Sequence, residues 1–185
     1  TPCGTLFPYT TLFRSEKIEW HTGKSGRSRY SEYERYATYA DFLQRCLTII
    51  ARDASPLATV QSRAKDPASF AEKAVRMLHR GSNYEMTDLC GGRIITNSLE
   101  EAETLCRLLQ QYFLIDEGNL EDTRERLRAE QFGYLSMHAV VQVDPKKLPT
   151  EIERKFRGDI KLINGPNPDG HPVKRKAEIQ VRTYL

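Results

Sequence analysis

The sequence lacks long apolar runs, since no stretch approaches the ~20 consecutive apolar residues that cross a bilayer. Cysteine is scarce, and the four cysteines form no C-x-x-C pair: Cys3, Cys46, Cys90 and Cys106. The four histidines are scattered, so no spacing typical of a zinc site is present. These absences exclude a membrane-spanning protein and a disulfide scaffold, and they predict a cytoplasmic protein with reduced, buried thiols.

Strong charge of one sign is also missing. The formal net charge of +3 is too small to indicate a nucleic-acid partner by itself. Charged residues make up 29% and hydrophobic residues 39% of the chain, which is typical of a globular protein. With 185 residues and no internal repeat, the chain is suited to one domain, or to one domain with an extra helical piece.

The first residues do not fit the rest of the chain. Residues 5–15, "TLFPYTTLFRS", resemble the translation of a common sequencing-adapter oligonucleotide, so we expect 1–15 to be non-native. Residues 16–30 contain Gly-Lys-Ser without the spacing of a phosphate-binding loop, and we interpret them as a flexible basic lead-in. Because "AEIQVRTYL" stops inside a strand-like run, we expect 31–185 to form a domain that is truncated at its C-terminus.

Helical periodicity predicts two long helices, over residues 31–52 and 99–113. The first has one apolar stripe, made of Tyr36, Ala40, Leu43, Cys46, Leu47 and Ile50. The second has a shared face, made of Leu99, Ala102, Cys106, Leu109 and Phe113, and Ser98 is its predicted cap. Asp66 and Pro67 are typical of a helix start and predict a helix over 67–79.

Strands and loops fill the intervals between these helices. The predicted strands are 57–63, 92–96, 113–118, 134–143 and 176–183. A short helix is predicted over 150–156, and loops over 121–131 and 163–172. Because helices and strands mix along the whole chain, we expect one α/β (α+β) domain with helices packed on a mixed sheet.

Three of the predicted strands have a polar side, because alternate residues of a strand face the same way. The polar sets are Gln61, Arg63 and Lys65; Tyr134, Ser136 and His138; and Glu178, Gln180 and Arg182. A single strand of this kind is equally typical of an ordinary solvent-facing strand. Three together, with cations, a carboxylate, an imidazole and an aromatic ring, indicate a concave face for a nucleotide.

Four stretches occur in order at plausible spacing: "SRAKDPASFAEK", "TDLCGGRII", "FGYLSMHAVV" and "EIQVRT". Together, from about Val60 to Thr183, they resemble the synthetase domain of the RelA/SpoT family, which makes the alarmones guanosine tetra- and pentaphosphate. The stretch "FGYLSMH" is closer to the small single-domain members. The resemblance implies a nucleotidyltransferase-like mixed β-sheet and transfer of pyrophosphate from ATP to the 3′-hydroxyl of GDP or GTP.

The resemblance also implies roles for individual residues. It implies that Asp88 and Glu178 are the catalytic and Mg²⁺-binding carboxylates. It implies ATP contacts by Arg63, Lys65, Lys73 and Arg93. It implies an acceptor seat made of Gly133, Tyr134, Ser136, His138, Gln180 and Arg182. Mg²⁺ prefers oxygen ligands and keeps positions for phosphates, so one or two carboxylates suffice.

Several alternatives stay open at this point. Glu130 and Gln131 stand where long members have an acceptor-binding lysine, and Arg126 or Arg128 could replace it. The acceptor could therefore be GDP, GTP, GMP, an adenine nucleotide or the 3′ end of a tRNA. The last two would indicate a toxin-type relative with an antitoxin partner. A non-catalytic nucleotide- or RNA-binding module and a homo-oligomer also remain open. Asp88 could instead cap a helix end, Glu178 could be a solvated strand residue, and Lys73 could be an exposed helix residue.

Overall fold

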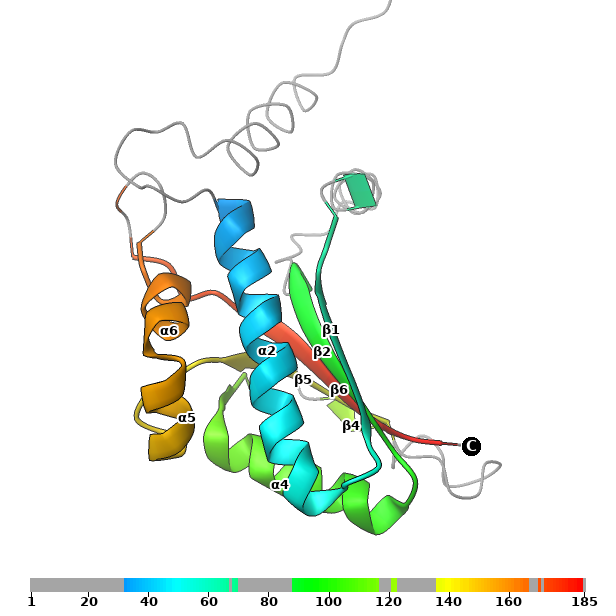
Figure 1. Cartoon of the computed structure of the whole chain (residues 1–185). Coiled ribbons are helices and arrows are strands. Elements are labelled where there is room, and N and C mark those ends of the chain that lie inside the picture. Colours follow the sequence, from blue (N-terminus) through cyan, green and yellow to red (C-terminus); the bar gives the residue numbers. More distant parts are fainter. Residues whose placement is uncertain are drawn as a thin grey trace, which may run out of the picture.

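A computed structural model describes residues 32–66, 68–69, 88–116, 121–122, 136–166, 170 and 172–184 of the chain. Within these residues the chain forms a six-stranded mixed sheet in the order β1-β2-β6-β5-β3, with β4 paired to β5 (Figure 1). The strands are β1 (Thr59–Ala64), β2 (Cys90–Thr96), β3 (Leu114–Ile115), β4 (Glu121–Asp122), β5 (Ser136–Gln142) and β6 (Ala177–Thr183). The helices are α2 (Glu32–Ala54), α4 (Leu99–Tyr112), α5 (Thr150–Lys155) and α6 (Arg157–Ile163). The predicted α/β (α+β) fold with a mixed sheet is confirmed.

The helices cover one face of the sheet. In Figure 1, α2 lies across the strands, with α4 at one end and α5 and α6 alongside. α2 packs against β1, β2 and α6, while α4 packs against β6 and β2. Gly92 permits a close approach here, since a Cβ at this position would lie 2.5 Å from Leu47 Cδ1 of α2. All six stripe positions predicted for the first helix are buried.

The predicted face of α4 is only partly right. Ser98 caps the helix as expected, because its side chain accepts a hydrogen bond from the Glu101 backbone N–H. Ala102 and Leu109 are buried, but Leu99 is 44% exposed and Leu105 is buried in its place. Helical periodicity identifies an apolar stripe, but it does not show which residues of the stripe the sheet covers.

Two elements are not predicted from the sequence. β4 lies in the predicted loop over 121–131, where a strand of two residues, Glu121–Asp122, pairs with His138 and Met137 of β5. α6 is too short for a clear helical period, and its apolar residues Ile160 and Ile163 are buried by tertiary packing. Both elements depend on contacts between distant segments rather than on a local pattern.

Two buried arginines hold the C-terminal end of α6. Arg35 Nη1 donates to the Leu162 carbonyl at 2.7 Å. Arg175 Nη1 donates to the carbonyls of Ile163 at 2.8 Å and Gly165 at 2.6 Å. Carbonyls at a helix C-terminus lack partners within the helix and favour nearby cations. Arg175 thereby fixes the segment that enters β6.

The expected burial of the thiols holds for two cysteines. Cys46 and Cys90 are buried, and Cys106 is partly exposed. Burial raises the pKa of Cys46 to about 12 and holds the pKa of Cys90 well above its usual range. Both are neutral thiols, so they act as small packing groups rather than nucleophiles.

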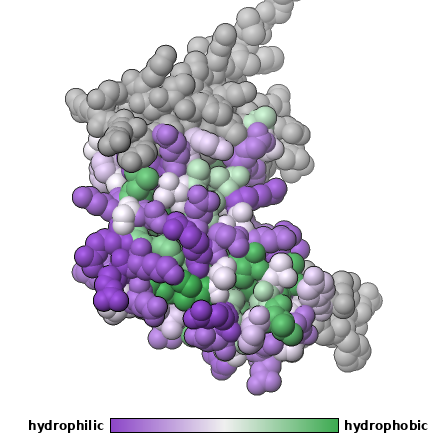
Figure 2. All heavy atoms as spheres, viewed as in Figure 1, coloured by the Kyte–Doolittle hydropathy of each residue, from purple (hydrophilic) through white to green (hydrophobic). Residues whose placement is uncertain are grey.

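Polar side chains dominate the face seen in Figure 2, where apolar side chains form only small patches. Among the described residues, Leu57 is the most exposed large apolar side chain, at 79%. No helix in this part of the chain is long and apolar enough to cross a membrane.

Candidate functional site

The three predicted polar strand faces lie on one surface, opposite the helices. The strand registers place Gln61 beside Arg93, Arg93 beside Gln180, and Gln180 beside His138. Directly opposed residues of neighbouring strands point to the same face. Four strands therefore contribute one continuous polar row.

Glu178 lies in the next row, where it pairs with Gly91 of β2 and Val140 of β5. Arg63 of β1 pairs with Gly91 from the other side, so it belongs to the same row. The helix-facing neighbours of Glu178, Ala177 and Ile179, are fully buried. The core thus fixes the β6 strand, and the alternation of the strand presents Glu178 on the polar face.

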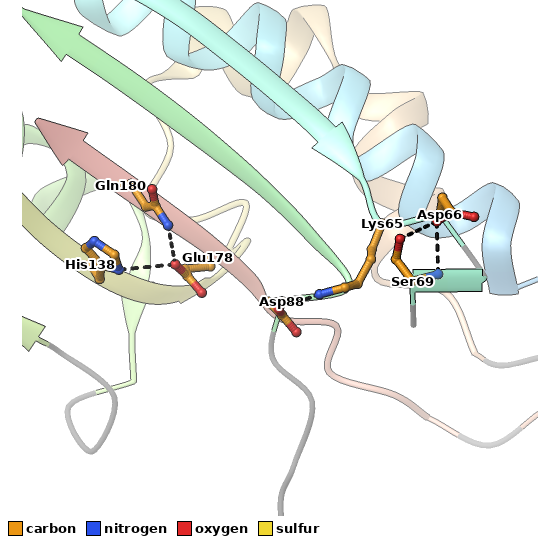
Figure 3. A network of polar contacts seen from close by, with 7 residues as sticks. All are labelled: Lys65, Asp66, Ser69, Asp88, His138, Glu178 and Gln180. Atoms are coloured by element: carbon orange, nitrogen blue, oxygen red, sulfur yellow. Dashed lines mark hydrogen bonds and ion pairs between the residues drawn. The ribbon is translucent and has the colours of Figure 1, made fainter. Parts of the chain in front are cut away.

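A hydrogen-bonded cluster holds the Glu178 carboxylate (Figure 3). Its Oε1 accepts from Gln180 Nε2 at 2.6 Å and lies 3.3 Å from His138 Nδ1. Arg93 Nε donates to Gln180 Oε1 at 3.2 Å, and His138 Nε2 lies 3.0 Å from Ser136 Oγ. Within the described part of the chain, Glu178 Oε2 accepts no hydrogen bond.

A second carboxylate lies two residues before β2. Asp88 Oδ2 is 2.7 Å from Lys65 Nζ, and the two side chains are 22% and 20% exposed. Lys65 directly follows β1, and its backbone N–H donates to the Leu89 carbonyl, which continues the pairing of β1 with β2. The Asp88 carboxylate thus contacts a cation from the neighbouring strand end.

Both carboxylates line one cleft of about 630 Å³, a size typical of small-molecule sites. Four predicted site residues on β1, β2 or next to their ends line it: Arg63, Lys65, Asp88 and Arg93. Glu178 and Gln180 of β6 complete it, together with Gln61, Gly91 and other residues. Three of the four predicted ATP contacts, Arg63, Lys65 and Arg93, therefore share one cavity with the predicted catalytic glutamate.

Gly91 forms part of the cleft floor between Arg63 and Glu178. A Cβ here would lie 2.6 Å from the backbone oxygen of Glu178, and a backbone atom in a sheet cannot move aside easily. A side chain would therefore push β2 away from β6 at the position of Glu178. The glycine is required by this close approach of the two strands.

We expect Gly91→Ala to destabilise the protein by about 1–3 kcal/mol through overpacking. Urea unfolding would measure this loss. Gly158→Ala is the matched control, because nothing lies within 4 Å of a Cβ at this helical position. The control should be neutral or slightly stabilising, by about 0.5–1 kcal/mol. Equal stability of the two variants would contradict the tight packing of β2 against β6.

The donor set of this cleft fits the predicted Mg²⁺. Asp88 and Glu178 both line it, and the contact of Asp88 with Lys65 shows that this carboxylate attracts a positive charge. Within the described residues no group of three or more His, Cys, Asp or Glu side chains forms a complete metal cage. Two carboxylates are nevertheless enough for an ion that takes further ligands from phosphates.

Some predicted site residues lie outside the described part of the chain: Lys73, Gly133 and Tyr134. The Asp66 carboxylate accepts from the backbone N–H groups of Ala68 and Ser69, as expected for a helix start at this position. Arg182 pairs with Ser136, so both lie on the polar face beyond His138. The sequence-based prediction missed three residues near the site: Lys176, Asp116 and Gly91. Of these, Lys176 could be found from its spacing, because it lies two residues before Glu178.

Comparison with known proteins decides the family. The model of the region found in RelA/SpoT proteins matches residues 62–159, which is more than half of the chain. The chain belongs to the RelA/SpoT family. No curated protein sequence matches it.

Solved structures share the fold of this RelA/SpoT chain at low sequence identity. A GTP pyrophosphokinase family protein from Streptococcus pneumoniae is 22% identical with a TM-score of 0.55, over 82% of this chain and 68% of that one. Small alarmone synthetase 1 from Bacillus subtilis is 22% identical with a TM-score of 0.52, over 82% and 69%. The same synthetase bound to its product pppGpp is 19% identical with a TM-score of 0.51, over 82% and 73%.

Proposed function

We propose that the protein is an alarmone synthetase, which transfers pyrophosphate from ATP to the 3′-hydroxyl of GDP or GTP. The observation that carries this proposal is the shared cleft: Arg63, Lys65 and Arg93 supply cations beside the carboxylates of Asp88 and Glu178. Family membership and the likeness to a synthetase bound to pppGpp support it.

The reaction divides the polar face into two halves. ATP occupies the half over β1 and β2, where cations neutralise its phosphates. The acceptor lies along β5, where Ser136 and His138 face the same side as Glu178. Glu178 lies between the two halves, as a group that accepts a proton must.

The transfer itself exchanges one phosphorus–oxygen bond for another. The acceptor 3′-oxygen bonds to the β-phosphorus of ATP, the bond between this phosphorus and the oxygen bridging to the α-phosphate breaks, and AMP leaves. Glu178 takes the proton of the acceptor hydroxyl. Mg²⁺ held by Asp88 and Glu178 would neutralise phosphate charge. Positioning and charge neutralisation supply most of the catalysis in such reactions.

The contacts of Glu178 prepare it for this role. Gln180 and His138 both engage Oε1, so the orientation of the carboxylate is fixed from two sides. Arg93 in turn fixes Gln180, which links the donor half of the cleft to the catalytic group. A base held in one position loses less entropy when the substrates align.

The test of this function is a product analysis with ATP labelled in its γ-phosphate. GDP, GTP, GMP, AMP and tRNA are each offered with Mg²⁺, and the labelled products are separated. We expect the labelled γ-phosphate to move together with the β-phosphate to GDP or GTP, with release of AMP. Label on tRNA or on an adenine nucleotide would instead assign a toxin-type relative. Nucleotide binding without any transfer would leave only a binding module.

A mutation separates the two halves of the face. Arg63 is exposed on the cleft side of β1, away from the acceptor strand β5. We expect Arg63→Ala to weaken ATP binding about 10-fold, because a charge-assisted hydrogen bond to phosphate is lost. GDP binding should change little, and titration of each nucleotide alone measures both. Equal losses for the two nucleotides would show that the halves are assigned wrongly.

A further inference from the structure

A second lysine lies on the catalytic face, on the far side of Glu178 from the ATP cations. Lys176 is partly buried, its neighbours Arg175 and Ala177 are fully buried, and Glu178 is again partly exposed. This alternation continues the pattern of β6, so Lys176 points to the same side as Glu178. Lys176 does not line the cleft that we assign to ATP.

Asp116 turns this lysine toward the acceptor half. Lys176 Nζ lies 3.1 Å from Asp116 Oδ2, and the side chains are 18% and 26% exposed. Asp116 directly follows β3, and its backbone N–H donates to the Val140 carbonyl of β5. The ammonium group is thus drawn from β6 across β5, the strand that carries His138.

The described part of the acceptor half has fewer cations than the donor half. A nucleoside di- or triphosphate carries several negative charges, and burying them requires paired positive groups. The donor cleft has Arg63, Lys65 and Arg93, whereas the described part of the acceptor half has Arg182 and Lys176 beside His138. A lysine ammonium has three N–H donors, so a phosphate can join or replace a carboxylate partner.

We propose that Lys176, positioned by Asp116, binds the 5′-phosphate chain of the acceptor nucleotide and selects di- and triphosphates over monophosphates. This inference rests on the proposed function, which seats the acceptor along β5. Asp116 is a positioning residue: its carboxylate orients the Lys176 ammonium group and also partly cancels the positive potential of that group. The two residues therefore have opposite effects on phosphate affinity, which a purely structural ion pair would not have.

The experiment measures dissociation constants of GMP, GDP, GTP and ATP by titration calorimetry for four proteins: wild type, Lys176→Met, Asp116→Asn and Lys161→Met. Lys176→Met keeps the apolar stem and removes the charge. Asp116→Asn keeps a carbonyl oxygen for the lysine and removes the anion. Lys161 is exposed on α6, on the opposite side of the sheet, so Lys161→Met controls for net charge.

We expect Lys176→Met to weaken GTP and GDP binding about 10-fold, with GMP and ATP nearly unchanged. Asp116→Asn should tighten GTP binding by about 3- to 5-fold, because a negative charge near the phosphates is removed. Both effects should shrink at high salt, and Lys161→Met should have neither.

Other outcomes overturn the proposal. Unchanged affinities in both variants, or shifts in the same direction, would make the pair structural. A loss for ATP equal to the loss for GTP would place Lys176 in the donor site. If Lys176→Met fails to fold, the sign of the Asp116→Asn effect still decides. Wild type that prefers adenine acceptors would overturn the proposed acceptor, and the AMP, ADP and ATP series would then test Lys176 in the same way.

Discussion

Glu178→Gln is expected to lower the rate of pyrophosphate transfer by about 10²- to 10⁴-fold, the usual contribution of general acid–base catalysis. The glutamine keeps the volume and can still accept from Gln180 Nε2 at the position of Oε1. What it loses is the negative charge and the capacity to take the proton of the acceptor hydroxyl. The fold should persist, because Ala177, Ile179 and Val181 still anchor β6 in the core.

Single-turnover kinetics with saturating ATP and acceptor would measure this loss, and calorimetry would show whether both nucleotides still bind. Glu100→Gln is the matched control, since Glu100 is exposed on α4. The control should retain wild-type turnover. Activity of Glu178→Gln within a few-fold of wild type, with both nucleotides bound, would remove Glu178 from the chemistry.

Much of the site could be read from alternation along strands. Glu178, Gln180 and Arg182 alternate with fully buried apolar residues, and the structure places all three on the face opposite the helices. The pattern identifies a polar face on each strand. It does not say which strands are neighbours, because β2 and β6 are far apart in the sequence and parallel in the sheet.

Side-chain pairings could not be read in this way. The contacts of Lys65 with Asp88 and of Lys176 with Asp116 join residues from different strands or strand ends. Such pairs depend on the register between strands, and a slip of one residue would abolish them. The role of Gly91 also depends on the packing of β2 against β6, so the Gly-Gly pair alone does not reveal it.

The two buried arginines show a similar limit for the fold. Arg35 lies on α2 and Arg175 precedes β6, yet both donate to the end of α6. In the sequence they read as ordinary charged residues, because burial of arginine is rare and needs carbonyl partners. Since α6 itself has only a short apolar pattern, neither the helix nor its caps could be predicted.

We expect Asp88, which contacts Lys65, to act in two distinct ways. With Mg²⁺ present, the carboxylate would hold the ion that neutralises the ATP phosphates. Without Mg²⁺, it is a negative charge beside the phosphates that also engages Lys65 Nζ at 2.7 Å. We therefore expect the same carboxylate to favour ATP binding with Mg²⁺ and to oppose it without Mg²⁺.

Asp88→Asn should lower turnover by about 10²- to 10³-fold at millimolar Mg²⁺, comparable to the loss of one electrostatic stabiliser. With excess chelator, we expect the same variant to bind metal-free ATP a few-fold more tightly than wild type, because one repelling charge is removed and Lys65 is released. Calorimetric ATP titrations with and without Mg²⁺ would measure the change in ATP affinity under both conditions. Asp53→Asn is the control, since the Asp53 side chain is 85% exposed at the end of α2. Weaker ATP binding by Asp88→Asn in chelator as well as in Mg²⁺ would mean that Asp88 supports the structure of the cleft rather than a metal ion.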